Sequence, residues 1–157
     1  MTLDAVDHAI LAVLQSEGRI TNVELAGRIG LSPGPTLARV NKLEAAGYIQ
    51  GYAAIVDRPK LGIAVTVFVL VSLRNPNRAA NDAFLAAVRD LPEILEIHHI
   101  AGDEDFLLKV VAESPAAYET FMLEQLANVP DVMRVKTVFV LSSPKSTTSI
   151  PIPGGSQ

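Results

Sequence analysis

Apolar residues in the first part of the chain recur every three or four positions, which is the spacing of amphipathic helices. The first run extends from Leu3 to Leu14, and Gly18 follows it as a helix stop. Thr21 and Glu24 then form a capping-box sequence, which is typical of a helix start. Together with a third run that ends before Gly47, this pattern predicts three short helices.

The connection between the second and third helices has the composition of a tight turn. Gly30 tolerates the left-handed backbone that reverses a chain, Ser32 is a favourable N-cap, and Pro33 suits the first position of a helix. Two helices joined in this way, over residues 25–49, form a helix-turn-helix whose second helix enters the major groove of DNA. The sequence therefore predicts a DNA-binding unit.

The third helix can be divided by face. At about 100° per residue, its inward side carries Thr36, Leu37, Val40 and Leu43. The outward side is small or polar, and Arg39, Asn41 and Lys42 offer hydrogen bonds to bases or phosphates. The alternative is that these are ordinary solvent-facing residues. The candidate DNA contacts are Ser32, Gly34, Pro35, Thr36, Ala38, Arg39, Asn41 and Lys42.

Beyond residue 48 the pattern changes to strands separated by helices. Residues 49–56 predict a strand that leads into a hinge ending at Gly62. Further strands are predicted at 65–73, 94–100, 106–111 and 132–141, with helices at 79–91 and after Ser114. This order is the ferredoxin-like βαββαβ pattern, so the fold class is α+β. Both helices would cover one face of the sheet, and a second subunit would cover the other.

These changes of pattern divide the chain into four parts. We expect a helix-turn-helix domain at 1–48, a strand connector and hinge at 49–63, and a ferredoxin-like domain at 64–142. Residues 143–157 are rich in Ser, Thr, Pro and Gly and have little to bury, which predicts a flexible tail.

Composition narrows the class of protein. The 157 residues include no cysteine, which excludes disulfides and thiol chemistry, and no apolar run long enough to span a bilayer. The net charge is −4, yet six Lys or Arg balance six Asp or Glu up to Lys60, so the net negative charge lies beyond that residue. We expect a cytoplasmic protein without a signal peptide or a membrane partner.

The stretch from Leu3 to Leu61 resembles the winged-helix half of the leucine-responsive regulatory protein / asparagine regulator (Lrp/AsnC) family of prokaryotic transcription factors. The resemblance is carried by LDAVDHAIL and by GRITNVELAGRIGLSPGPTLARVNKLEAAGYIQGYAAIVD. It implies a winged helix-turn-helix that binds double-stranded DNA, followed by a sensing domain for a small effector. It also implies a homodimer through the sheet, with further assembly into higher oligomers such as an octamer.

The loop between the second and third predicted strands is the candidate effector site. Gly102 allows an unusual backbone turn, and Asp103 and Asp105 could accept bonds from an ammonium group while free loop N–H groups hold a carboxylate. An α-amino acid needs both. In the family this loop lines the effector cleft between dimers, with Glu104 here in place of a common aromatic residue and Thr137 facing the same cleft. The alternative is a solvated acidic turn.

The sequence offers little support for a catalytic or metal site. His98 and His99 are neighbours on a predicted strand and point to opposite faces, so they cannot easily hold one ion. No cofactor or enzyme activity is predicted. Two alternatives to a ligand-responsive transcriptional regulator remain open: a tetrapyrrole-processing decarboxylase, since relatives of this architecture have that activity, and a sensing module that does not bind DNA.

Overall fold

The computed structural model describes residues 2–152, which divide into two compact units. The first, the DNA-binding unit, contains the residues up to Ile55 together with those from Lys145 onward. The second, the sensing unit, is Val56–Pro144. Each unit has its own hydrophobic core.

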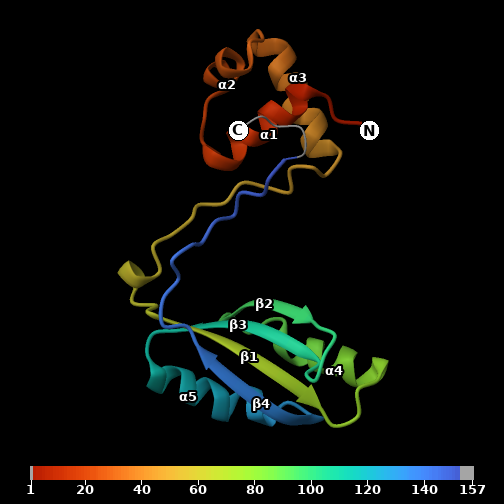
Figure 1. Ribbon diagram of the computed structural model, residues 1–157, viewed down its shortest axis with the longest axis vertical. Helices are drawn as coiled ribbons and strands as arrows, with labels where there is room; N and C mark the ends of the chain where they lie inside the picture. The colour runs from red at the N-terminus through yellow and green to blue at the C-terminus, as the bar shows by residue number, and fades with distance from the viewer. Residues whose placement is uncertain (1, 153–157) are drawn as a thin grey trace. The chain divides into compact units, whose positions relative to one another are not determined.

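The DNA-binding unit contains the three predicted helices, α1 (Ala5–Ser16), α2 (Asn22–Ile29) and α3 (Pro33–Ala45) (Figure 1). Capping boxes begin both α1, at Asp4, and α2, at Thr21. Gly30 ends α2 in the left-handed conformation, with φ of 72°, as its position in the turn predicts. The centre of the core consists of fully or almost fully buried Ile10, Leu25 and Leu43.

The strand predicted at residues 49–56 is absent. A strand needs a neighbour for its backbone N–H and C=O groups, and no other described segment forms a ladder with these residues. Their apolar side chains are also exposed, with Ile55 83% and Val56 59% accessible. Residues 49–56 therefore form a connector without secondary structure and not a sheet strand.

The sensing unit has the predicted βαββαβ order (Figure 1). Its elements are β1 (Val65–Leu73), α4 (Arg78–Val88), β2 (Ile94–His99), β3 (Phe106–Ala112), α5 (Pro115–Glu124) and β4 (Val132–Phe139), with short 3-10 turns at Pro59–Leu61 and Leu126–Asn128. The four strands lie in the order β2-β3-β1-β4, and every pair is antiparallel. This confirms the ferredoxin-like fold.

The two faces of the sheet have different environments. Alternate residues of β1 and β3, such as Val69 and Leu108, are fully buried against α4 and α5. The residues between them form the open face, which no described element of the chain covers. Phe68 and Leu70 are only half-buried there, and Val138 is 42% exposed. The open face is thus an apolar surface without a cover in the single chain.

The predicted flexible tail contains no helix or strand over its described residues, 143–152. Part of it nevertheless makes specific contacts within the DNA-binding unit. The Ile150 N–H donates to Oε1 of Gln15 at 2.7 Å, and Nε2 of Gln15 donates to the Ile150 carbonyl at 3.2 Å. Flexibility of the tail stays a prediction, but these bonds give it a defined place against α1.

The helices of residues 2–152 are all too short or too polar to cross a membrane.

Candidate functional site

The outward side of α3 is the candidate DNA interface. Gly34, Pro35, Ala38, Asn41 and Lys42 are all exposed there, as the helical projection predicts. Ser32 precedes the helix as its N-cap residue, but its side chain makes no capping hydrogen bond. Its exposed hydroxyl is therefore available to an external acceptor or donor, such as a DNA phosphate.

Two predictions on α3 are wrong. Thr36, a candidate DNA contact, is fully buried, and its hydroxyl donates to the Ser32 carbonyl at 2.9 Å. It holds the first turn of α3 and cannot touch DNA. Leu37 was assigned to the inward side but is 49% exposed. Because Leu37 lies about 100° from Thr36 around the helix, it falls on the flank and not in the core.

Arg39 does not point freely toward solvent. Its Nη1 donates to Oδ2 of Asp4 and to Oδ1 of Asp7, both at 2.7 Å. The Asp7 side chain is only 7% exposed, whereas those of Arg39 and Asp4 are 34% and 52% exposed. A charged group of α3 is therefore joined to the start of α1, which gives Arg39 a structural partner, and its contact with DNA stays a prediction.

The same two aspartates also form the capping box of α1. The Asp7 N–H donates to Asp4 and the Asp4 N–H donates to Asp7, at 2.8 and 3.1 Å. The Asp7 backbone bond lowers the pKa of Asp4 below its ordinary value of 3.8, and the hydrogen bond from Arg39 lowers it further. The bonds from Asp4 and Asp7 in turn raise the pKa of Arg39. Asp4 and Arg39 are thus both charged at neutral pH.

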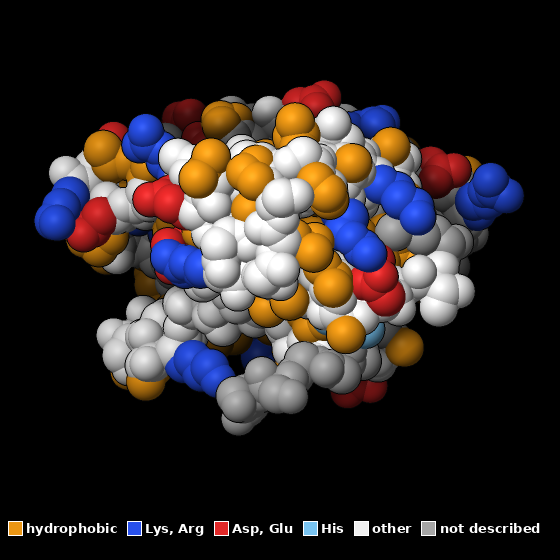
Figure 2. Space-filling model, turned by 90° about the horizontal axis from the view of Figure 1, so that it is seen from above, with side chains coloured by type: hydrophobic (Ala, Val, Ile, Leu, Met, Phe, Trp, Pro, Cys, Tyr) orange, Lys and Arg blue, Asp and Glu red, His pale blue; other side chains and the backbone are white. Residues whose placement is uncertain are grey.

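Two further cations lie near the turn, and they differ in whether they form an ion pair. Arg28, at the end of α2, forms a two-bond pair with Glu17, which lowers the pKa of that carboxyl group. Lys42 forms no ion pair with any described residue. On the face shown in Figure 2, the Lys and Arg side chains are spread over several places and do not form one continuous basic patch. Lys42 is therefore the cation of α3 that is open to DNA.

Asp105 of the acidic loop has a structural partner. Its Oδ2 accepts from the Leu73 N–H at 2.7 Å, and its own N–H donates to the Val71 carbonyl at 2.9 Å. These bonds attach the loop to the end of β1. The Asp105 carboxylate thus already has a hydrogen-bond donor, which makes it a weaker candidate for a ligand's ammonium group than the sequence suggested.

The remaining loop residues differ in environment. Glu104 is half-buried and lies 3.7 Å from the Arg134 guanidinium on β4. Asp103 is exposed and pairs with no described cation. Gly102 does not adopt a positive φ, and a Cβ atom there would meet nothing within 4 Å. The loop thus reverses without a left-handed residue at Gly102.

Thr137 lies on the helix side of the edge strand β4. It pairs with Val69, two residues along β1 from the Val71 carbonyl that holds Asp105. Its hydroxyl is 2.7 Å from the Tyr118 hydroxyl on α5. Burial raises the pKa of Tyr118, so this phenol stays neutral and can donate. Within one chain, Thr137 is thus bonded to α5 and to no residue of the acidic loop.

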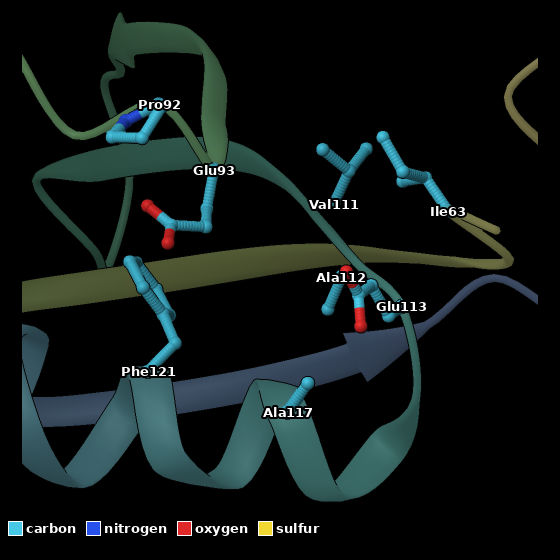
Figure 3. Close-up of a pocket in the computed structure, with 8 residues that line it drawn as sticks. All are labelled: Ile63, Pro92, Glu93, Val111, Ala112, Glu113, Ala117 and Phe121. Atoms are coloured by element: carbon cyan, nitrogen blue, oxygen red, sulfur yellow. The ribbon is translucent and has the colours of Figure 1, made fainter. Parts of the chain in front are cut away.

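Sequence reasoning missed a cavity at the other end of β3 (Figure 3). It has a volume of about 390 Å³ and is lined by Val111 and Ala112 at the end of β3, by Ala117 and Phe121 of α5, and by Glu93 among others. None of the predicted effector residues lines it. Its lining residues come from several elements, so no local sequence motif predicts the cavity.

His98 and His99 point to different faces, as predicted. Nε2 of His98 lies 3.2 Å from Glu96, whose other carboxylate oxygen accepts from Lys109 at 2.7 Å. The ring of His99 stacks on Phe106 with centroids 5.0 Å apart. Among the described residues, no group of three or more His, Cys, Asp or Glu is placed to hold a metal ion.

Comparison with known proteins covers both units. A family model described as winged helix-turn-helix DNA-binding matches residues 3–50, and one described as Lrp/AsnC ligand binding domain matches residues 66–150. The chain is 41% identical to a leucine-responsive regulatory protein from Rhizobium meliloti, over 96% of each chain. It is 39% identical to the transcriptional regulator AzlB of Bacillus subtilis, again over 96% of each.

Solved structures agree with these matches. A transcriptional regulator from Neisseria meningitidis, determined as a complex with L-Met, superposes with a TM-score of 0.92 at 39% identity, covering 96% of this chain and 97% of that one. AsnC of Escherichia coli superposes with a TM-score of 0.87 at 28% identity, over 96% of this chain and all of that one. Both units of the fold are thus represented in each relative.

Proposed function

Because the chain belongs to the Lrp/AsnC family of transcriptional regulators, with a helix-turn-helix DNA-binding domain and a ligand-binding domain, we propose how its own residues carry out this function. The outward side of α3 meets the DNA, an amino acid acts as the effector, and subunits pair through the open face of the sheet. The observation that carries the proposal is the exposed polar side of α3, held on a buried core. We further propose that the chain acts in the cytoplasm and catalyses no reaction, as its relatives are named as regulators.

On DNA, four residues of α3 have complementary roles. Gly34 and Ala38 are exposed and small, so the helix can approach base edges or a thymine methyl group closely. Asn41 can bond an adenine through two hydrogen bonds, and Lys42 can reach guanine or a phosphate. Ser32 and Pro35 lie at the start of the helix, where contacts to phosphates set its position.

The effector site is proposed at Gly102, Asp103 and Glu104. Asp103 is the exposed carboxylate of the loop without a described cation, so it can receive the ammonium group of an amino acid. Asp105 supports the loop through its bond to the Leu73 N–H. The relative solved with L-Met makes methionine the first amino acid to test. In the proposed cleft, which forms where subunits meet, Thr137 on the exposed edge strand comes from a neighbouring subunit.

Replacing Asp103 by Asn is expected to weaken binding of L-methionine by about ten- to a hundredfold, because one charge-assisted hydrogen bond is worth roughly 1.5–3 kcal/mol. Calorimetric titration of the full chain measures this. Asp90→Asn, at an exposed acid after α4, serves as the matched control and should leave affinity unchanged. Equal affinities of the unaltered chain and the Asp103 variant would place the effector elsewhere.

Pairing of subunits through the open face is proposed because that face carries half-buried apolar residues and the single chain supplies nothing to cover them. A twofold dimer would present two copies of α3 to DNA, and further assembly of dimers, up to an octamer, would create clefts next to the acidic loops. An effector that binds one assembly better than another shifts the balance between them by that difference in affinity.

A further inference from the structure

The path of the chain joins the two units twice. Residues up to Ile55 belong to the DNA-binding unit, Val56–Pro144 form the sensing unit, and from Lys145 the chain is again part of the DNA-binding unit (Figure 1). The second connection depends on the contact between the tail and α1. With the tail bound to α1, both ends of the sensing unit's chain are attached to the DNA-binding unit, and without that contact only the N-terminal end is attached.

The contact uses a side chain suited to hold an extended backbone. The Gln15 amide donates to the Ile150 carbonyl at 3.2 Å and accepts from the Ile150 N–H at 2.7 Å, so it satisfies both backbone groups of one residue. The Ser149 hydroxyl donates to the Gln15 carbonyl at 3.4 Å. Because Ile150 precedes Pro151, its backbone is biased toward the extended form that this arrangement needs.

Apolar residues of both segments lie next to these bonds and line a common cavity. A cavity of about 330 Å³ lies beside the tail, and its lining includes Leu3 and Leu11 on the α1 side and Pro151 and Ile152 on the tail side. Ile150 itself remains 71% exposed, and all three hydrogen bonds are exposed to solvent. Exposed bonds of this kind contribute little net stability each, so the tail can bind α1 and be released from it.

We propose that residues 145–152 act as a second tether, which docks on α1 through Gln15 and restrains the DNA-binding unit relative to the sensing unit. This inference rests on the proposed function, in which two copies of α3 bind two half-sites together. A docked tail reduces the range of orientations that each DNA-binding unit samples. The restraint raises the effective concentration of the second α3 at its half-site and leaves the affinity of each α3 for one half-site unchanged.

The test compares two DNA fragments from the region upstream of the protein's own coding sequence, one with both half-sites and one with a single half-site. A chain that ends at Pro144 and the full chain with Gln15→Ala should each bind the two-site fragment roughly tenfold more weakly, with single-site affinity unchanged. Ser16→Ala is the matched control, because the Ser16 hydroxyl donates only to the Ala12 and Val13 carbonyls of its own helix. Light scattering should give the same mass for every protein.

Docking itself is measured by hydrogen exchange at the Ile150 amide, which should be slower in the unaltered chain than in Gln15→Ala. Equal exchange rates, two-site affinities within twofold of the unaltered chain in both tail variants, or a fall in mass on truncation would each overturn the tether. Failure of the unaltered chain to bind either fragment would instead refute the proposed function, and the tether with it.

Discussion

Replacing Arg39 by Gln is expected to destabilise the DNA-binding unit and to weaken operator binding without removing a phosphate contact. Arg39 joins α3 to Asp4 and Asp7 at 2.7 Å each. Its loss leaves the Asp7 carboxylate, 7% exposed, without a cation. Losing the charged hydrogen bond to this largely buried carboxylate, which keeps the Asp4 N–H as a donor, costs about 1.5–3 kcal/mol. For a unit of this size, each kcal/mol lowers the melting temperature by about 4–8 °C.

Salt dependence separates this positioning role from direct contact. Lys42→Ala, on the same helix, is the matched control: its melting temperature should be unchanged, and the slope of log affinity against log salt should fall by about 0.9, the value for one phosphate. Arg39→Gln should lower affinity at every salt concentration and leave the slope unchanged. Asp7→Asn should add little to Arg39→Gln, because the two residues act as one unit. A stable Arg39 variant with a reduced slope would restore Arg39 as a DNA contact.

Replacing Leu70 by Glu is expected to separate the proposed dimer. Leu70 lies in the middle of the open face, paired with Leu107 on β3 and Lys136 on β4. Moving a carboxylate from water into an apolar interface typically costs several kcal/mol, of which a pair with Lys136 recovers only part, so the dimer dissociation constant should rise by roughly a hundredfold. Operator affinity should fall with it, because a monomer presents a single α3.

Leu123→Glu provides the comparison. Leu123 is also apolar and is 65% exposed, but it lies on α5, on the opposite side of the sheet. This variant should stay dimeric by light scattering and bind DNA normally. A monomeric unaltered chain, or a Leu70 variant that remains dimeric at micromolar concentration, would place the interface elsewhere.

Local patterns predicted the helices and strands well, because their signals are short in range. The capping box at Thr21, the left-handed Gly30 and the β-branched residues of β1 each depend on a few neighbouring residues. Leu43, which the helical spacing assigned to the inward side of α3, lies at the centre of the core with Ile10 and Leu25. The fold class could therefore be predicted from the sequence alone.

Contacts between distant residues could not be predicted in the same way. Arg39 meets Asp7 across 32 positions of sequence, and Gln15 meets Ile150 across 135. Nothing in the spacing of the recognition helix distinguishes an arginine that faces DNA from one that turns back to α1. Asp105 is likewise an unpaired loop acid as far as its sequence neighbours indicate, but its carboxylate accepts a hydrogen bond from the distant Leu73 N–H at 2.7 Å.

The central claim is that α3 of this chain reads a DNA sequence, and binding to its own upstream DNA tests it most directly. Affinity should be measured at a stated salt concentration for that fragment and for a shuffled fragment of equal length and composition. The unaltered chain should bind the upstream fragment at least about a thousandfold more tightly than the shuffled one, as specific regulators do. The double variant with Asn41→Ala and Lys42→Ala should lose that preference. Equal affinity for the two fragments, or a preference that survives both substitutions, would contradict it.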